Sequence, residues 1–152
     1  MVRTGPFHPP PAAALEHREG TRVPLIGVGL PAGLSSQIEL EVTPADTAQA
    51  VGSGDVEVLA TPRLVALCEQ AAARALAPHL AAGQTSVGFR VEITHLVPVL
   101  VGGRITAAVA LERVEGKRLT FNATVTDKCG LVAAGRVVRV LVDAGAFMEK
   151  AR

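Results

Sequence analysis

Three polar residues fall where the surrounding sequence is apolar: Thr61, Glu69 and His95. Their side chains supply a hydroxyl, a carboxylate and an imidazole, which together can make a hydrolytic site. The carboxylate can act as base or nucleophile, the imidazole as general acid or base, and the hydroxyl can orient a water or the carboxylate. A structural pair of Glu69 and His95 would leave the same pattern, and helix capping would account for Thr61. The residues alone therefore leave a catalytic and a structural role as alternatives.

A helix over residues 61–77 must position two of these groups. Thr61 is a good N-cap, Pro62 suits the first helical position, and Pro78 ends the helix. The helix has almost no polar face, and every residue one turn before or after Glu69 is apolar. We therefore expect a buried helix that carries a buried carboxylate. Burying a charge is costly unless it is paired, so such a group is a candidate for catalysis.

His95 lies in a strand predicted over residues 86–98. With a period of two, it is the only polar member of a face that it shares with Val87, Phe89, Val91, Ile93 and Val97. A single inward histidine is commonly a hydrogen-bonded core residue. The catalytic alternative makes His95 the partner of Glu69. Gly88 lets a substrate approach the backbone closely, and we expect the substrate to contact Gly88 with its neighbours Val87 and Phe89.

The remaining segments complete an α+β fold. Alternating residues predict a half-buried strand over residues 36–42. A loop over 47–54 and a short extended piece over 55–60 lead into the helix. Three further strands and a terminal helical turn are predicted over residues 104–114, 117–127, 131–142 and 144–150. One long helix cannot cover both faces of this meandering antiparallel sheet, so we expect a homodimer.

Domain organisation follows from composition along the chain. Residues 1–33 are rich in proline, glycine, alanine and charge, which predicts an irregular N-terminal extension. Residues 34–152 then form one domain. His8 and His17, in the extension, lack nearby ligand-type partners. We therefore expect neither a metal nor another cofactor.

Composition excludes several classes of function. The net charge of +1 and the lack of Trp and Tyr argue against nucleic-acid binding and against an anionic membrane surface. No apolar run reaches the roughly 18 residues of a membrane span. Two cysteines, Cys68 and Cys129, lie far apart and are expected to be buried free thiols. These features indicate a cytoplasmic protein.

The sequence resembles the fluoroacetyl-CoA thioesterase-like branch of the hotdog-fold thioesterases. The resemblance spans about residues 35–150. It rests on the order and spacing of Thr61, Glu69, Gly88 and His95 within the segments 58–61, 77–80, 86–88, 91–95 and 114–119.

That resemblance implies a hotdog fold, in which a curled antiparallel sheet wraps one long central helix, and a dimer with active sites at its interface. It also implies hydrolysis of a short or small acyl-CoA to free acid and coenzyme A, with Thr61, Glu69 and His95 catalytic and Gly88 near the thioester carbonyl.

The sequence departs from the fluoroacetyl-specific pattern at one place. The resemblance implies phenylalanines before the catalytic threonine, which form a lid over the fluorinated acyl group. Here residues 52–57 contain no aromatic, and a loop rich in glycine and serine cannot form the same dry gate. Fluoroacetyl selectivity is therefore not expected. Two other functions remain open: a non-catalytic acyl-CoA or small-ligand binder on the same scaffold, and a hotdog hydratase, although the short Asp–His motif of hydratases is missing.

Overall fold

The structure, a computed structural model, describes residues 25–26 and 29–152. Most of the predicted extension, including His8 and His17, lies outside the described residues. The elements follow in chain order: β1 (Leu25–Ile26), β2 (Leu30–Pro31), β3 (Ser35–Glu41), α1 (Ala48–Val51), α2 (Thr61–Leu76), β4 (Gln84–His95), β5 (Arg104–Glu115), β6 (Arg118–Asp127), β7 (Gly130–Asp143) and α3 (Ala144–Lys150). No helix in this part of the chain is long and apolar enough to cross a membrane.

The main sheet has five antiparallel strands in the order β3-β5-β6-β7-β4. Strands β5, β6 and β7 follow one another as predicted. The prediction of a simple meander is wrong at β4, which pairs with β7 and forms one edge of the sheet. The opposite edge is β3. A strand's periodicity shows which face it buries, but it does not show which distant strand it pairs with.

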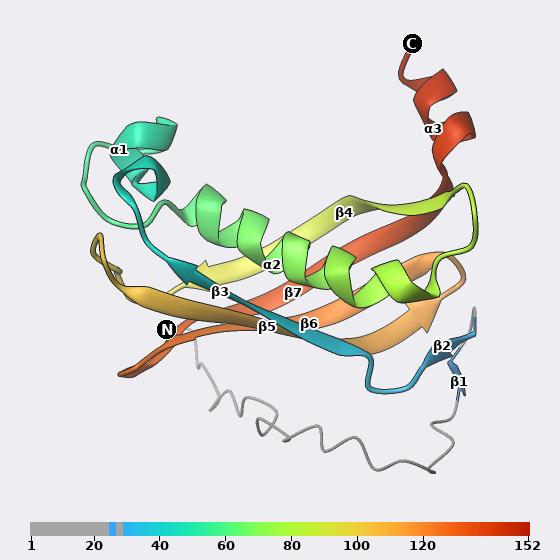
Figure 1. Cartoon of the computed structure of the whole chain (residues 1–152), viewed down its shortest axis with the longest axis horizontal. Coiled ribbons are helices and arrows are strands. Elements are labelled where there is room, and N and C mark those ends of the chain that lie inside the picture. The colour runs from blue at the N-terminus through green and yellow to red at the C-terminus, as the bar shows by residue number, and fades with distance from the viewer. Residues whose placement is uncertain (1–24, 27–28) are drawn as a thin grey trace, which may run out of the picture.

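Helix α2 lies along one face of the sheet, which curls around it (Figure 1). Its inward stripe is fully apolar and packs on β3 to β7. The buried residues of this stripe are Leu64, Leu67, Cys68, Ala71, Ala72, Ala75 and Leu76. Phe121 on β6 is completely buried beneath it. Each such large side chain contributes roughly 1.5–3 kcal/mol when fully buried. Ala66, Gln70 and Arg74 are exposed, so one stripe of the helix does face outward.

A β-bulge at Phe89 interrupts β4. The register with β7 shifts between Gly88 and Arg90, so the alternation of faces changes there. Val91, Ile93 and His95 keep one face, but Phe89 is 53% exposed and does not share it. The single apolar face predicted for the whole strand is therefore wrong on the N-terminal side of the bulge.

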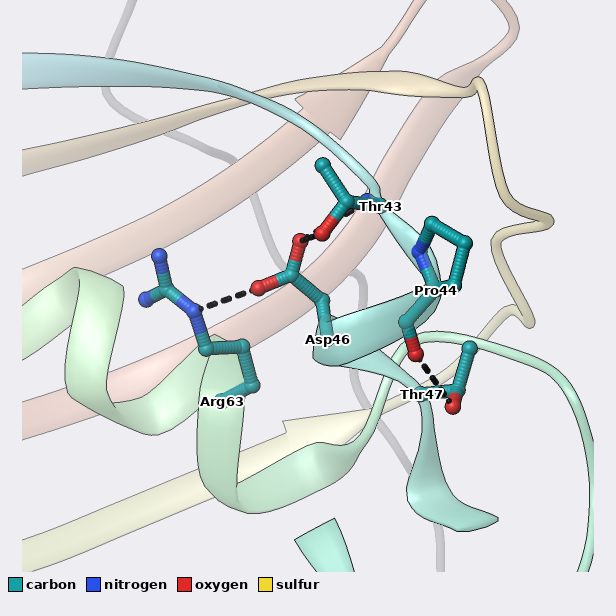
Figure 2. A network of polar contacts seen from close by, with 5 residues as sticks. All are labelled: Thr43, Pro44, Asp46, Thr47 and Arg63. Atoms are coloured by element: carbon teal, nitrogen blue, oxygen red, sulfur yellow. Dashed lines mark hydrogen bonds and ion pairs between the residues drawn. The ribbon is translucent and has the colours of Figure 1, made fainter. Parts of the chain in front are cut away.

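The segment before α2 is fixed by a buried carboxylate, that of Asp46, shown in Figure 2 between Thr43 and Arg63. Its Oδ2 accepts hydrogen bonds from the Thr43 backbone N–H and hydroxyl, both at 2.8 Å. Its Oδ1 accepts from Arg63 Nε at 2.9 Å, and its backbone carbonyl accepts from Ala60 N–H at 2.9 Å. These bonds tie the segment around α1 to the first turn of α2.

Candidate functional site

Thr61 and His95 form a direct pair at one end of α2. The distance from Thr61 Oγ1 to His95 Nδ1 is 2.9 Å. The hydroxyl donates to Nδ1 when the ring proton is on Nε2, and it accepts from Nδ1–H in the other tautomer. The residues come from the first helical position and from the last position of β4. The long strand and the long helix therefore meet at this point.

The pairing explains why Thr61 does not cap the helix. The N-cap is Ala60, and no side chain caps this end. Thr61 is the first residue with helical geometry, so its hydroxyl is free to reach across to the strand. The predicted N-cap role of Thr61 is wrong, and helix capping no longer accounts for the residue.

The second ring nitrogen of His95, Nε2, is buried and makes no hydrogen bond among the described residues. A buried polar atom without a partner costs roughly 1–3 kcal/mol. Such an atom is a natural contact for a substrate or water, because the cost is recovered on binding.

Glu69 lies two turns further along α2, against Gly88 of β4. A Cβ built at position 88 would collide with Glu69 Oε1, so only glycine leaves the carboxylate its place. The Glu69 side chain is 34% exposed, which corrects the prediction of a fully buried carboxylate. The opening that keeps it partly exposed also gives a ligand access to it.

Arg139 was not among the predicted site residues, but its buried guanidinium approaches Glu69. Its Nε and one terminal nitrogen donate to the hydroxyl and backbone carbonyl of Ser86, both at 2.9 Å. The other terminal nitrogen lies 3.6 Å from Glu69 Oε1. Burial lowers the pKa of Arg139, and the nearby Glu69 carboxylate partly offsets this. A lone charge between Val137 and Leu141 on an otherwise buried face was the signal that could have found it.

Within one chain, Glu69 and His95 do not form the predicted pair. The hydrogen-bond partner of His95 is Thr61, and the carboxylate of Glu69 faces Gly88 and Arg139. The eight residues from Thr61 to Glu69 span about 12 Å along a helix. The site therefore consists of two clusters, Thr61 with His95 and Glu69 with Gly88 and Arg139.

An open apolar cavity of about 380 Å³ adjoins the first cluster. Thr61 and His95 line it together with side chains before α2 and after β4, among them Val56, Val58 and Leu96. Its volume is in the range of small-molecule sites. We call this cavity the acyl trough.

Phe89, which was predicted to contact the substrate with Val87 and Gly88, lies outside both clusters, and its substrate contact stays a prediction. Its ring packs under Arg118, whose guanidinium carbon is 4.5 Å from the ring centroid. Both residues line a separate cavity of about 350 Å³ that is rich in charged side chains. Val87 is half-buried in the β4–β7 ladder, and its substrate contact stays a prediction.

The two cysteines differ in environment. Cys68, next to Glu69, is fully buried, and burial, with a smaller effect from the Glu69 charge, raises its pKa to about 12. Cys129 is exposed in the β6–β7 turn, contrary to the prediction that both are buried. Neither belongs to a metal-binding cluster: the described part of the chain holds no group of three or more His, Cys, Asp or Glu that could bind an ion.

Known proteins show the same architecture. A solved structure of the fluoroacetyl-CoA thioesterase FlK superposes with a TM-score of 0.77 at 28% identity, covering 82% of this chain and 96% of that one. A hot-dog-like protein from Thermanaerovibrio acidaminovorans gives a TM-score of 0.74 at 29% identity, covering 80% and 90%. The predicted hotdog fold is thereby confirmed.

The sequences agree with the structures. The chain is 33% identical over 96 residues to the fluoroacetyl-CoA thioesterase of Streptantibioticus cattleyicolor, an alignment that covers 63% of this chain and 69% of that protein. Residues 42–145, which include both clusters of the site, match the family described as fluoroacetyl-CoA-specific thioesterase, FlK. The chain belongs to the fluoroacetyl-CoA-specific thioesterase family.

Proposed function

We propose that this chain hydrolyses a short or small acyl-CoA thioester to the free acid and coenzyme A, using Thr61, Glu69 and His95. Family membership supports the reaction class. One observation carries the assignment of the site: the Thr61–His95 pair lines an open cavity and leaves His95 Nε2 buried without a partner. A core histidine with a purely structural role would have both ring nitrogens satisfied.

The contacts of each residue support a separate role in the reaction. Thr61 holds the orientation of the His95 ring, a role different from the positioning of the carboxylate that the sequence suggested. Glu69 accepts a proton from water as the water oxygen adds to the thioester carbonyl carbon. The carbon–sulfur bond then breaks, and the coenzyme A sulfur takes up that proton by way of His95 or solvent. Backbone N–H groups at the Gly88 bulge are the candidates for holding the carbonyl oxygen.

The alternative role for Glu69 is nucleophilic, with an acyl-enzyme anhydride that water then opens. Turnover in H₂¹⁸O can reveal the nucleophilic role. A general base and an anhydride that water opens at its acyl carbonyl both leave the Glu69 carboxylate unlabelled, whereas an anhydride opened at its enzyme-side carbonyl adds ¹⁸O to Glu69, so label above that of the control peptide shows the nucleophile. Mass spectrometry of the Glu69 peptide after many turnovers gives the readout, with Glu92 on β4 as the internal control.

A homodimer with sites at its interface is part of the proposal. Strand β4 is twelve residues long and forms the edge of the described sheet. Long free edges tend to pair with another strand. Antiparallel pairing of two β4 edges brings the Gly88 end of one strand toward the His95 end of the other. Such a dimer would place Glu69 of one protomer near the Thr61–His95 pair of its partner.

The remaining expectations are proposals of the same kind. We expect a cytoplasmic enzyme, which the two free cysteines support. We also expect it to need no metal or other cofactor, since coenzyme A arrives as part of the substrate, and to bind neither nucleic acid nor membrane.

Thiol release from a panel of acyl-CoA substrates tests the proposal. Glu69→Gln and His95→Ala should each lower kcat/KM by a factor of 10² to 10⁴ while the thermal unfolding curve stays cooperative. Glu92→Gln, an exposed carboxylate on the same strand as His95, is the matched control and should keep full activity. Full activity in both site variants would refute the assignment, and binding of acyl-CoA without any thiol release would favour the non-catalytic binder.

A further inference from the structure

We infer that the acyl trough holds an unbranched aliphatic acyl chain of about four to six carbons, longer than fluoroacetyl, and that it rejects acyl groups that end in a charge. This inference rests on the proposed function, because it assigns a substrate class to the same site. It depends on the lining of the trough, on the place of the catalytic pair within it, and on the loop that borders it.

The trough is lined by aliphatic side chains left open to solvent. Val56 and Leu96 are each 54% exposed, and Val97 is 42% exposed. Leu59, at the base, is buried. Exposed aliphatic side chains grouped around a cavity indicate a ligand site, since each methylene that a ligand buries there is favourable.

The catalytic pair decides which part of the substrate enters. Thr61 and His95 lie in the wall of the trough, so one arm of the thioester must pass along it. The pantetheine arm carries amides that need hydrogen-bond partners when they leave water. Apart from Thr61 and His95, Ser53 is the only lining residue with a polar side chain. The apolar arm, which is the acyl chain, fits this lining.

Apolar and charged residues alternate along residues 54–58, the loop that borders the trough, and the charged ones stay outside it. Gly54, Val56 and Val58 line it, whereas the intervening Asp55 and Glu57 do not and are exposed. The lining contains no Lys, Arg, Asp or Glu. A terminal carboxylate, as in succinyl-CoA, would therefore find no lysine or arginine to pair with. It would also meet the negative field of Asp55 and Glu57 at the rim.

The size of the trough favours an acyl chain longer than two carbons. At about 380 Å³ the space is far larger than a fluoroacetyl group needs, and no aromatic side chain narrows it. A short acyl group would leave Val56 and Leu96 facing water. A longer chain covers them, so binding improves with every added methylene until the chain leaves the trough.

The test compares acetyl-, butanoyl-, hexanoyl- and succinyl-CoA, with the binding of non-hydrolysable S-ethyl- and S-hexyl-CoA measured by calorimetry. We expect kcat/KM and thioether affinity to rise about twofold to fourfold per methylene up to six carbons. Succinyl-CoA should be at least tenfold poorer than butanoyl-CoA, which has the same number of carbons. Val56→Asp should remove the dependence on chain length.

The matched control is Val51→Asp, which places the same charge on a valine that is exposed but outside the trough. It should leave the chain-length series unchanged. Affinity or kcat/KM that is flat or falling from two to six carbons would overturn the inference. Absence of thiol release with every substrate would instead count against the proposed function, and the thioether series would still decide the inference.

Discussion

The buried guanidinium of Arg139 lies 3.6 Å from Glu69 Oε1 while the same group holds both the hydroxyl and the carbonyl of Ser86. Strand β7 thus fixes the carboxylate that helix α2 presents to the site. Arg139→Met should lower kcat about 10- to 100-fold and change KM less than about threefold. The Glu69 carboxylate loses its orientation in this variant, whereas the substrate keeps its binding contacts. Steady-state kinetics give this split.

Two companion variants separate positioning from folding. Arg139→Lys keeps the charge but loses the planar fork, so it should recover only part of the rate. Arg136→Met, an exposed position on the same strand, should leave kcat within about twofold of the native value. Equal losses of kcat in Arg139→Met and Arg136→Met would contradict the positioning role.

Thr61→Val should separate the hydroxyl's chemistry from helix stability. Because Ala60 is the N-cap, loss of the hydroxyl removes no cap, and the free energy of unfolding should change by less than the ~1 kcal/mol that a lost cap costs. The bond to His95 Nδ1 is lost, so kcat/KM should fall at least tenfold. Thr61→Ser should retain most of the activity. Denaturant unfolding measures the stability of the variants, and steady-state kinetics measure their activity. Destabilisation of more than ~1 kcal/mol by both Thr61→Val and Thr61→Ala would mean that Thr61 caps the helix.

Gly88→Ala should displace the Glu69 carboxylate, since the added methyl group collides with Oε1. We expect at least a tenfold loss of kcat/KM and a destabilisation of about 1–2 kcal/mol from overpacking. In a Glu69→Ala background the collision is absent, so Gly88→Ala should then be nearly neutral for stability. A double-mutant cycle by chemical denaturation measures this coupling. Additive effects would mean that the two residues do not meet.

Asp46→Asn should change how stability depends on pH. Burial alone would raise the pKa of Asp46, but hydrogen bonds from Thr43 and Arg63 outweigh it and hold the pKa below the ordinary value of 3.8. A lowered folded-state pKa stabilises the protein above the unfolded-state pKa, and this contribution is lost as pH falls through the folded-state pKa. The variant should be about 1–3 kcal/mol less stable at pH 7 and should show a shallower loss below about pH 4. Urea unfolding at pH 3, 4, 5 and 7 tests this, and parallel curves for the two proteins would contradict it.

The cysteines should react at very different rates. Burial raises the pKa of Cys68 to about 12, so almost no thiolate is present at pH 8, whereas Cys129 is exposed. Iodoacetamide should therefore label Cys129 alone in the folded protein and both residues in urea. Peptide mass spectrometry shows the sites, with Cys129→Ser as the control. Fast labelling of Cys68 under native conditions would show that the core near Glu69 opens.

Much of the fold could be predicted, because local patterns determine local structure. The helix predicted over 61–77 spans Thr61–Leu76, and the predicted terminal turn over 144–150 coincides with α3. Helix α1 was missed, since a single turn of four residues inside a predicted loop has too few positions to show a period. The position of β4 at the edge was also missed, because its pairing with β7 joins residues far apart in the chain.

Four residues of the candidate site could be picked out from the sequence, but their contacts could not, and their roles stay a prediction. Thr61, Glu69, Gly88 and His95 stand out as residue types in an apolar setting. The bond from Thr61 to His95 depends on where the helix begins relative to its cap, a difference of one residue that sequence patterns do not resolve. The approach of Arg139 to Glu69 depends on strand register across the sheet. Each of these relations is set by tertiary contacts rather than by local preference.

The bordering loop has a practical consequence for engineering. Backbone hydrogen bonds hold the two ends of this loop together: Ala48 N–H donates to the Val58 carbonyl, and Gln49 N–H donates to the Val56 carbonyl. The Asp46 network joins this segment to Arg63 in the first turn of α2 (Figure 2). Substitutions at loop positions such as Val56 should therefore leave Thr61 in place, so the lining of the trough can be varied separately from the Thr61–His95 pair.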